Sequence, residues 1–327
     1  MSVEVIIVNY RSGDVLPACL SALREQSIPH QVMIVDNASG DDSARTIHRA
    51  FPEGSILPLR RNVGFARAVN IAASRSEAEL IVTLNPDTVP EPNFLEHILA
   101  PFVDKPLLGS VAGTLVFASQ PDTIASAGIS VHRNGVAIDA MLGELHDSTV
   151  PPIPVFGASA GAAAYRRDPF LTSGGLAEPF FMYLEDVDLA WRLRLQGYES
   201  LWAPGAVVCH HYSLSAGEGS DFKRRLLARN RIWTLARCLP EEIWERDRMR
   251  ILAFDAAAFG YSMATLDRAA TFGRLNALAG LLPRLAERRA IQSTRTASID
   301  EIDRWIGPAM SPQKLLALRE LTGTLAS

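Results

Sequence analysis

The sequence predicts an α/β fold in which a mostly parallel sheet is flanked by helices and followed by a helical C-terminal region. Short runs of Val, Ile and Leu alternate with helical patterns in the first half, which is typical of parallel strands buried on both faces. Strand and turn signals dominate from about residue 111 to 150. Beyond Asp221 the chain is helical by pattern and rich in Ala, Leu and Arg.

The first strands are expected at residues 3–8, 31–35 and 80–84, which are apolar and carry few charges. Residues 14–26 and 64–74 place their apolar side chains at helical spacing, so a helix is predicted for each segment. In open sheets of this kind, ligands bind beyond the carboxyl ends of the strands.

A further strand is expected at residues 111–117, and Asn134-Gly135 is a hairpin turn signal. We expect one α/β domain over residues 1–235, with a first part over residues 1–115 and a second over residues 116–235, followed by a helical region over residues 236–327.

Composition limits the class of protein. The chain has 327 residues, of which 48% are hydrophobic and 21% charged. A chain of this size can bury a hydrophobic core without stabilisation by disulfides or a structural metal. A net charge of −4 does not favour nucleic acid as a partner. The three widely spaced cysteines favour a reducing compartment, and neither an export signal nor a spanning segment is apparent. We therefore expect a cytoplasmic protein.

Polar side chains follow three of the expected strands. Turn formers often stand at such places, so each pair taken singly has a plain structural alternative. Three pairs in one sheet favour a binding site. The residues are Asn9 with Tyr10, Asp36 with Asn37, and Asn85 with Asp87.

Asp87 stands in the tripeptide Asn85-Pro86-Asp87, which alone could be an ordinary turn. A carboxylate held there could bind a divalent cation that bridges two phosphates. His210 follows an apolar run and could be a second ligand, although a single histidine is more often structural.

An aromatic block precedes three carboxylates, Glu185, Asp186 and Asp188, at the start of an expected helix. Acidic residues stabilise a helix N-terminus, and Asp188 with Arg192 forms an i,i+4 pair, so the group has a structural explanation. That explanation leaves the aromatic block unexplained. Apolar walls around a carboxylate raise its pKa, which suits a general base.

Arg61, Asn62 and Gly64 precede or open an expected helix, whose free N–H groups could bind an anion. Arg61 could equally be a solvated surface charge. The glycine-rich dinucleotide fingerprint and the phosphate-binding loop are absent after the first strand, which disfavours a dehydrogenase or P-loop enzyme.

Taken in order, these motifs resemble the inverting family 2 glycosyltransferases of GT-A fold, and among them the rhamnosyltransferase-like bacterial branch. The resemblance covers about residues 2–237. It rests on Val8-Asn9-Tyr10, Val35-Asp36-Asn37-Ala38-Ser39, Arg61-Asn62-Val63-Gly64-Phe65, Asn85-Pro86-Asp87, Gly157-Ala158-Ser159-Ala160-Gly161, Glu185-Asp186-Val187-Asp188, and His210 with Arg229-Asn230-Arg231.

The resemblance implies that residues 1–115 are the nucleotide-binding part and residues 116–235 the acceptor-binding part of the glycosyltransferase domain, and it implies a role for each matching position. Asp186 would be the catalytic base, and Asp87 with His210 would hold Mg²⁺ or Mn²⁺, with His211 as the alternative to His210. Asn85 replaces an aspartate of the family's motif, which puts its direct role in doubt. Asp36 would bind the base of the donor nucleotide. The other expected nucleotide-site residues are Asn9, Tyr10, Asn37, Arg61, Asn62, Gly64 and Asn85, and the expected supports of the acceptor site are Glu185, Asp188, Trp191 and Arg192.

The implied function is the transfer of a sugar from a nucleotide-diphosphate donor to a glycan or lipid-linked acceptor, with dTDP-rhamnose as the leading donor. A nucleotidyltransferase and a non-catalytic nucleotide- or glycan-binding protein remain as alternatives. Residues 220–290 hold 14 Lys or Arg against 8 Asp or Glu. This helical tail could contact the inner face of the membrane, pair with a second copy, or simply pack on the core.

Overall fold

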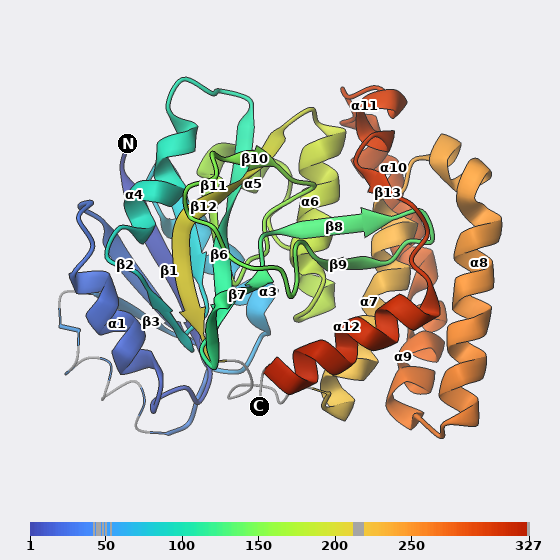
Figure 1. Ribbon diagram of the computed structural model, residues 1–327, viewed down its shortest axis with the longest axis horizontal. Coiled ribbons are helices and arrows are strands. Elements are labelled where there is room, and N and C mark those ends of the chain that lie inside the picture. The colour runs from blue at the N-terminus through green and yellow to red at the C-terminus, as the bar shows by residue number, and fades with distance from the viewer. Residues whose placement is uncertain are drawn as a thin grey trace.

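A computed structural model describes residues 1–41, 43, 47, 49, 51–52, 54–211 and 219–325. Figure 1 shows a twisted central sheet with helices against it and a separate group of helices formed by the later part of the chain. This mixed α/β arrangement with a helical C-terminal region is the fold that the sequence predicts.

The N-terminal half of the sheet is parallel. β1 (Val3–Asn9) lies between β2 (Gln31–Asp36) and β4 (Leu80–Leu84), and β3 (Ser55–Pro58) pairs with β2. β1 and β4 are buried along their whole length, as expected for apolar strands covered on both faces. The three strands predicted in this region are confirmed.

The other half of the sheet is mixed. β11 (Ala162–Arg166) runs antiparallel between β4 and β6 (Leu108–Phe117), and β6 pairs in parallel with β12 (Glu199–His210). Ala162 at the start of β11 pairs with Leu84 at the end of β4, so the chain enters β11 from the ligand-binding edge. Parallel pairing therefore holds only for part of the sheet. The remaining strands of this half are β5 (Thr88–Pro90), β7 (Gln120–Ser126) and β10 (Ile153–Pro154).

Helices cover both faces of the sheet, because successive side chains along each strand point to opposite sides. Val5 and Ile7 of β1 join the core beneath α1, whereas Ile6 and Val8 join the core beneath α3. The first core lies under α1 (Leu16–Arg24), α4 (Phe94–Leu99) and η1 (Ala100–Phe102). The second lies under α3 (Phe65–Arg75), α5 (Arg167–Thr172) and α6 (Glu185–Leu195).

A small second sheet joins the two parts of the molecule. β8 (Ile129–His132) and β9 (Ala137–Asp139) form the predicted hairpin, with Gly135 in its turn at a φ of 73°. β13 (Ile306–Gly307), from the helical tail, pairs in parallel with β8.

The tail consists of packed helices. α7 packs on α9 and α10, and α12 returns to the sheet, where Ser119 donates a hydrogen bond to the carbonyl of Leu325. No helix among the described residues is long and apolar enough to cross a bilayer. The division predicted at residue 235 falls inside α7, and its assignment as a domain boundary stays a prediction. The helices are α7 (Asp221–Cys238), α8 (Glu241–Ala264), α9 (Arg268–Ala279), α10 (Leu281–Ser293), α11 (Ile299–Asp303) and α12 (Pro312–Leu325).

Candidate active site

A cavity of about 860 Å³ opens beyond the carboxyl ends of β1 and β4. That volume suits a nucleotide-sized ligand, since small-molecule sites commonly span about 300–1,000 Å³. Asp87 and Asp186 line the same cavity, so the loops after Leu84 and Leu184 converge as the sequence requires. The sequence-predicted site residues in its lining are Tyr10, Asn37, Asn62, Gly64, Asn85, Asp87, Glu185, Asp186 and His210.

Asp87 and His210 form the expected carboxylate–imidazole pair. The Nε2 atom of His210 lies 3.2 Å from Oδ1 of Asp87, and both side chains are buried. β5 pairs antiparallel with β12, which brings His210 beside Thr88. His211 instead meets Asp87 through its backbone N–H, and its side chain is exposed. The geometry therefore favours His210 over His211 as the partner of Asp87.

The donor set fits a divalent cation that is shared with a substrate. The described residues contain no group of three or more His, Cys, Asp or Glu side chains that could hold a metal. Mg²⁺ is commonly bound through one or two carboxylates, with substrate phosphates and water completing its shell. Asp87 supplies one such carboxylate, with the imidazole of His210 beside it, and the pair does not match a structural metal cage.

Asp186 is fixed at the first turn of α6. Its Oδ2 accepts a hydrogen bond from the N–H of Ala160 at 3.1 Å, and its Oδ1 accepts one from the N–H of Val187 at 2.8 Å. Burial raises the pKa of this carboxyl, while the two backbone hydrogen bonds oppose the rise. Asp186 is half-buried, and a carboxylate with a defined orientation and a raised pKa has the properties of a general base.

Glu185 lies beside Asp186 in the cavity wall and is buried. Its Oε2 atom has no hydrogen-bond partner among the described residues. Burial, and then the neighbouring charge of Asp186, raise the pKa of Glu185 well above its usual value. Two adjacent carboxyls, one buried and one half-buried, therefore share this part of the site, and ionisation of one disfavours ionisation of the other.

Asp139, at the end of β9, is a third acidic group in the cavity, and sequence reasoning missed it. Burial raises its pKa to about 6, and the charge of Asp186 adds to that rise. A hydrogen bond with Ser126 and the charges of Lys223 and His210 act in the opposite direction. A single aspartate after a hairpin carries no local signal, because only the tertiary fold brings β9 opposite α6.

The loop before α6 is strained and is held by α7. Phe181, Tyr183 and Leu184 have φ values of 70°, 67° and 64°, a region that non-glycine residues rarely adopt. Asn230 of α7 is fully buried, and its amide donates to the carbonyls of Phe180, Met182 and Tyr183 at 3.1, 3.0 and 2.7 Å. The sequence motif contained Asn230 but gave it no role; the structure makes it the clamp of the loop that carries Asp186.

Gly64 allows the same loop to approach α3. Its φ is 85°, and a Cβ atom at this position would lie 2.5 Å from the carbonyl oxygen of Phe181. That carbonyl accepts a hydrogen bond from the N–H of Ala66 at 3.2 Å. The first turn of α3 is therefore partly occupied by the protein's own backbone, although Gly64 still lines the cavity.

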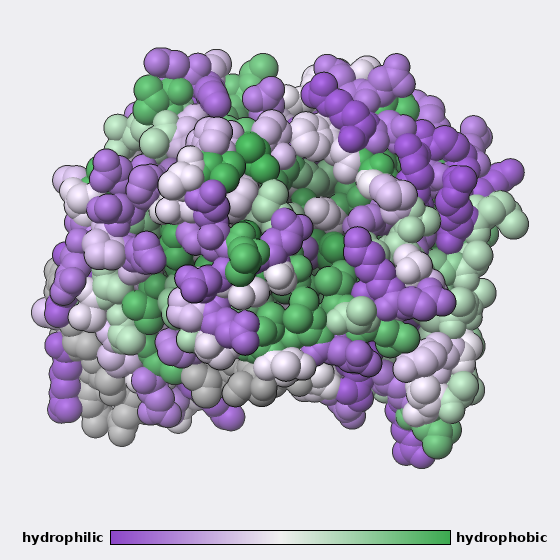
Figure 2. Space-filling model, viewed as in Figure 1, coloured by the Kyte–Doolittle hydropathy of each residue, from purple (hydrophilic) through white to green (hydrophobic). Residues whose placement is uncertain are grey.

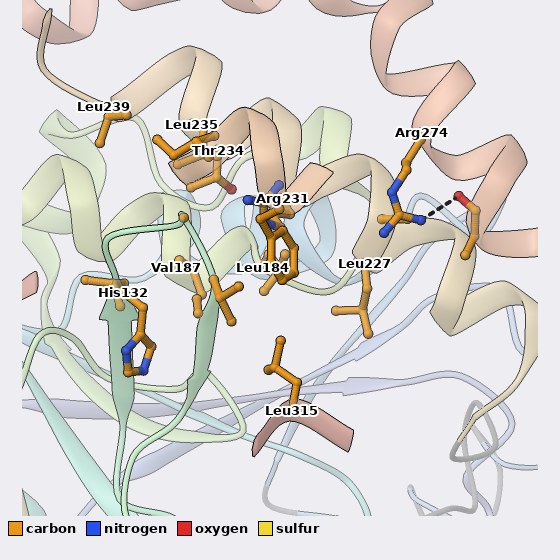
Figure 3. A pocket seen from close by; sticks show the side chains of 18 of the residues that line it. His132, Leu184, Val187, Leu227, Arg231, Thr234, Leu235, Leu239, Arg274 and Leu315 are labelled. Carbon is orange, nitrogen blue, oxygen red and sulfur yellow. Dashed lines mark hydrogen bonds between the residues drawn. The ribbon is translucent and has the colours of Figure 1, made fainter. Parts of the chain in front are cut away.

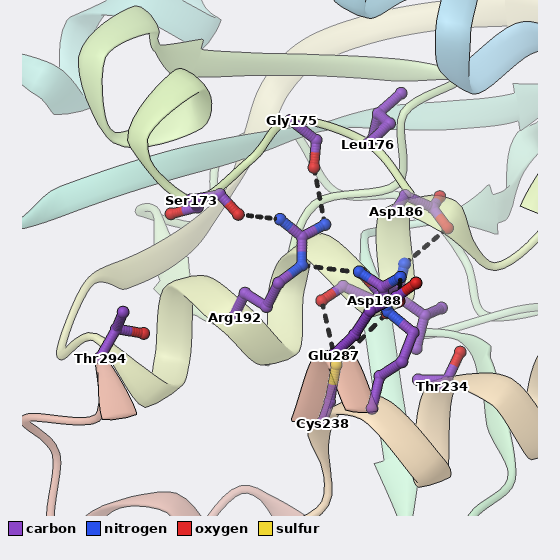
Figure 4. Close-up of polar contacts among 12 residues, drawn as sticks. Ser173, Gly175, Leu176, Asp186, Asp188, Arg192, Thr234, Cys238, Glu287 and Thr294 are labelled. Carbon is purple, nitrogen blue, oxygen red and sulfur yellow. Dashed lines mark hydrogen bonds and ion pairs between the residues drawn. The ribbon is translucent and has the colours of Figure 1, made fainter. Parts of the chain in front are cut away.

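Asp188, Trp191 and Arg192 do not line this cavity. Asp188 is fully buried between Arg192 and Arg237, each with a guanidinium Nε 2.7 Å from a carboxylate oxygen. Arg192 also donates to the carbonyls of Ser173 and Gly175, as Figure 4 shows. Both carboxylate oxygens of Asp188 are paired with guanidinium groups. The network therefore supports α6 on the side away from the cavity and does not contact a ligand there.

On the nucleotide side, the structure separates contact residues from supports. Asn9 has no exposed surface, and its amide donates to Asp36 at 3.0 Å, so it holds Asp36 and cannot line the cavity as expected. Asp36 is buried outside the cavity lining, and Arg61 is exposed outside it. Asn62 and Asn37 do line it, joined by a 3.0 Å hydrogen bond between their side chains.

Comparison with known proteins agrees with this architecture. Residues 4–172 match the profile of Glycosyl transferase family 2. The chain is 29% identical over 239 residues to N-acetylglucosaminyl-diphospho-decaprenol L-rhamnosyltransferase of Mycobacterium tuberculosis, covering 65% of this chain and 77% of that protein. It is 22% identical over 228 residues to O-antigen chain rhamnosyltransferase RfbN of Salmonella typhimurium, covering 68% and 70%.

Two solved structures share the fold. Staphylococcus aureus TarS 1-349 in complex with UDP-GlcNAc superposes with a TM-score of 0.58 at 16% identity, covering 92% of this chain and 89% of that one. GalNAc-T7 with UDP, GalNAc and Mn²⁺ gives a TM-score of 0.61 at 13% identity, covering 93% and 58%. The fold is thus GT-A-like, and the family match over more than half of its length places this chain in glycosyl transferase family 2.

Proposed function

We propose that the chain is an inverting glycosyltransferase that moves a sugar from a nucleotide-diphosphate donor to a hydroxyl group of a glycan or lipid-linked acceptor in cell-surface polysaccharide synthesis. The observation that carries this proposal is the shared cavity of Asp186 and the Asp87–His210 pair. Rhamnose from dTDP-rhamnose is the leading donor, because two of the similar proteins are named rhamnosyltransferases.

The reaction is a single displacement. Asp186 accepts the proton of the acceptor hydroxyl while that oxygen forms a bond to the anomeric carbon. The bond between this carbon and the diphosphate oxygen breaks at the same time, and the nucleoside diphosphate leaves with the electron pair. The configuration at the anomeric carbon is inverted.

The chain's own residues position both substrates for this step. Tyr10, Asn37 and Asn62 offer an aromatic ring and side-chain amides to the nucleotide, with Asn85 beside them. The N–H groups of Ala160 and Val187 hold Asp186 in one orientation. A Mg²⁺ or Mn²⁺ ion held by Asp87 and His210 would neutralise charge on the departing diphosphate.

A donor panel tests the proposal. The chain is incubated with dTDP-rhamnose and UDP-sugars, with Mg²⁺ or Mn²⁺, and nucleoside diphosphate release and thermal stabilisation are recorded. We expect one donor to be turned over, and Asp186→Asn to bind it but to react about 10²–10⁴-fold more slowly. Release of diphosphate from a nucleoside triphosphate would instead support a nucleotidyltransferase. Donor binding without turnover would support a binding protein.

We further propose a cytoplasmic location against the inner face of the membrane. Between residues 251 and 286 the exposed side chains include only one charged group, that of Arg268. Large apolar side chains are exposed there, among them Leu266 at 81%, Leu282 at 79% and Phe272 at 56%. Figure 2 shows part of this weakly polar surface over α8 at the right edge. Exposed apolar surface of this extent is typical of contact with a membrane or another protein.

A further inference from the structure

The β8–β9 hairpin borders the catalytic cavity at its base and a second cavity at its tip. His132 and Gly135, near the tip, line the second cavity, which has a volume of about 390 Å³. Figure 3 shows His132 and Leu315 among the side chains that surround it. Ile129 and Asp139, at the base, line the catalytic cavity. Asp139 is the only acidic residue between positions 129 and 139, so the hairpin brings a single carboxyl to the active site.

Backbone pairing places Asp139 on the same cavity wall as Asp186. Asp139 is the register partner of Ile129, and Ile129 donates a 2.9 Å hydrogen bond from its N–H to the carbonyl of Gly157 on its other side. Gly157 begins the segment in which the N–H of Ala160 donates to Oδ2 of Asp186 at 3.1 Å. A continuous series of backbone contacts therefore connects the positions of the two carboxyls, and both line the cavity.

The helical tail holds the hairpin in place. A guanidinium nitrogen of Arg133 lies 3.0 Å from a carboxylate oxygen of Asp303. The side-chain amide of Asn134 donates to the carbonyl of Met310 at 2.9 Å and accepts from its N–H at 3.1 Å. β13 adds a parallel strand beside β8. A side chain on an element that is fixed at several points can keep one orientation, which is what the positioning of a substrate requires.

This wall offers oxygen atoms to a polar ligand. Asp139 is half-buried, and burial raises its pKa to about 6, so it is mostly ionised at neutral pH. An ionised carboxyl has about four lone-pair sites, and the hydrogen bond with Ser126 uses one of them. The buried Oε2 atom of Glu185 has no partner among the described residues. Hydroxyl groups of a ligand would supply the hydrogen bonds that these oxygens accept.

We propose that Asp139 holds the acceptor sugar by accepting a hydrogen bond from a second hydroxyl of the ring whose first hydroxyl gives its proton to Asp186. Asp139 thereby selects acceptors that carry two free hydroxyls on one sugar, and it determines which of them reacts. The inference rests on the proposed sugar transfer for the role of Asp186. The groups proposed to hold the donor, Asp87, His210 and Tyr10, belong to other elements, so donor binding does not depend on Asp139.

A binding experiment with deoxy sugars tests this role without turnover. Methyl glycosides of glucose, galactose, mannose, rhamnose and N-acetylglucosamine are titrated into the full chain with saturating dTDP and Mg²⁺, and saturation-transfer NMR gives their affinities. Each hydroxyl of the glycoside that binds most tightly is then replaced by hydrogen. We expect one replacement to weaken binding to the wild type by about tenfold or more, because it removes a hydrogen bond to a charged group.

The same replacement should have no further effect on binding to Asp139→Ala, since the partner of that hydroxyl is already absent. Equal losses in the two proteins for every deoxy glycoside would overturn the proposal. Binding of none of the glycosides would also overturn it.

Kinetics separate the acceptor from the donor. At a pH above the acidic limb of the rate profile, Asp139→Ala should raise the acceptor KM by about tenfold or more and leave the donor KM within about twofold. Asp139→Asn should fall between Asp139→Ala and the wild type, because its amide oxygen still accepts a hydrogen bond. Asp122→Asn, at an exposed position of β7, is the control and should change neither constant. A raised donor KM with an unchanged acceptor KM would overturn the assignment.

This proposal and the proposed sugar transfer can fail separately. Glycoside binding that depends on Asp139, in a chain that turns over no donor, would retain the acceptor contact and reject the sugar transfer. Sugar transfer with an acceptor KM that Asp139→Ala leaves unchanged would retain the transferase and reject the acceptor contact.

Discussion

The Nε2 atom of His210 lies 3.2 Å from Oδ1 of Asp87, although the two residues are 123 positions apart in the sequence. The pairing of β5 with β12 fixes this distance, since Thr88 and His210 are register partners. A backbone ladder thus sets the spacing of two side chains that can both donate electron pairs to a cation.

The first prediction concerns this pair. Asp87→Asn and His210→Gln should each reduce stabilisation of the chain by Mn²⁺ in the presence of nucleoside diphosphate, and slow transfer by about 10–100-fold, which is typical for damage to a metal site. His211→Gln is the matched control, because that exposed neighbour meets Asp87 only through its backbone. A Mn²⁺ dependence that Asp87→Asn leaves unchanged would remove Asp87 from the site.

The sequence predicts the residues that line this cavity better than it distinguishes them from the residues that hold them in place. Asp87, Asp186 and His210 could be found because they follow apolar strand or aromatic runs in a recognisable order. Asn9 lies outside the cavity lining that the sequence predicts for it, because an amide that binds a ligand at the end of a strand has the same sequence pattern as one that holds a neighbouring carboxylate. Its hydrogen bond to Asp36 identifies it as a support.

The sequence likewise predicts where strands occur but not in which direction each one enters the sheet. The strands β1, β2 and β4 could be predicted, because burial on both faces removes charge from their sequences. The direction of β11 could not, since Ala162–Arg166 reads the same whichever way the strand enters the sheet. Asp139 could not be predicted for a related reason. The residues near it in the cavity come from other elements, so the sequence around position 139 contains no motif that indicates a site.

The second prediction concerns pH. The raised pKa of Asp186 means that its basic form, and with it the rate, is lost as pH falls through that value. Asp139 and Asp186 repel, so Asp139→Asn should lower the pKa of Asp186 and move the acidic limb of the kcat/KM profile to lower pH. Asp122→Asn, an exposed aspartate of β7, is the control and should leave the limb in place. A shift to higher pH would contradict the coupling.

The third prediction concerns stability. The pKa of Glu185 is raised in the folded chain, so protonation of this group favours folding, and that contribution is lost as pH rises through the raised pKa. Glu185→Gln mimics the protonated form and should increase the free energy of unfolding by about 1–3 kcal/mol above that pKa. The gain should shrink as pH falls. The measurement is the melting temperature across a pH series, with the exposed Glu245→Gln as the control; a gain that grows towards low pH would exclude the explanation.

The fourth prediction concerns the clamp on the strained loop. Asn230→Ala removes hydrogen bonds to three carbonyls and should release Phe181, Tyr183 and Leu184 from their positive-φ conformations. We expect kcat to fall by at least about tenfold through misplacement of Asp186, while the KM for the donor stays within about twofold. Asn93→Ala, at an exposed position that makes no side-chain cap bond, should alter neither value. Loss of stability with an unchanged kcat would make Asn230 purely structural.

The last prediction concerns the apolar face of the tail. Leu266→Glu with Leu282→Glu places charge on this face without disturbing the core, since the two side chains are 81% and 79% exposed. If lipid covers the face, the double variant should lose flotation with anionic liposomes, because burying a carboxylate in the interface is costly. Leu145→Glu is the control. Leu145 is 80% exposed, close to the exposure of the two tail leucines, but it belongs to the segment between β9 and β10 and not to the tail. Equal flotation of all three proteins would reject the membrane contact, and a change from dimer to monomer on sedimentation would assign the face to a second copy.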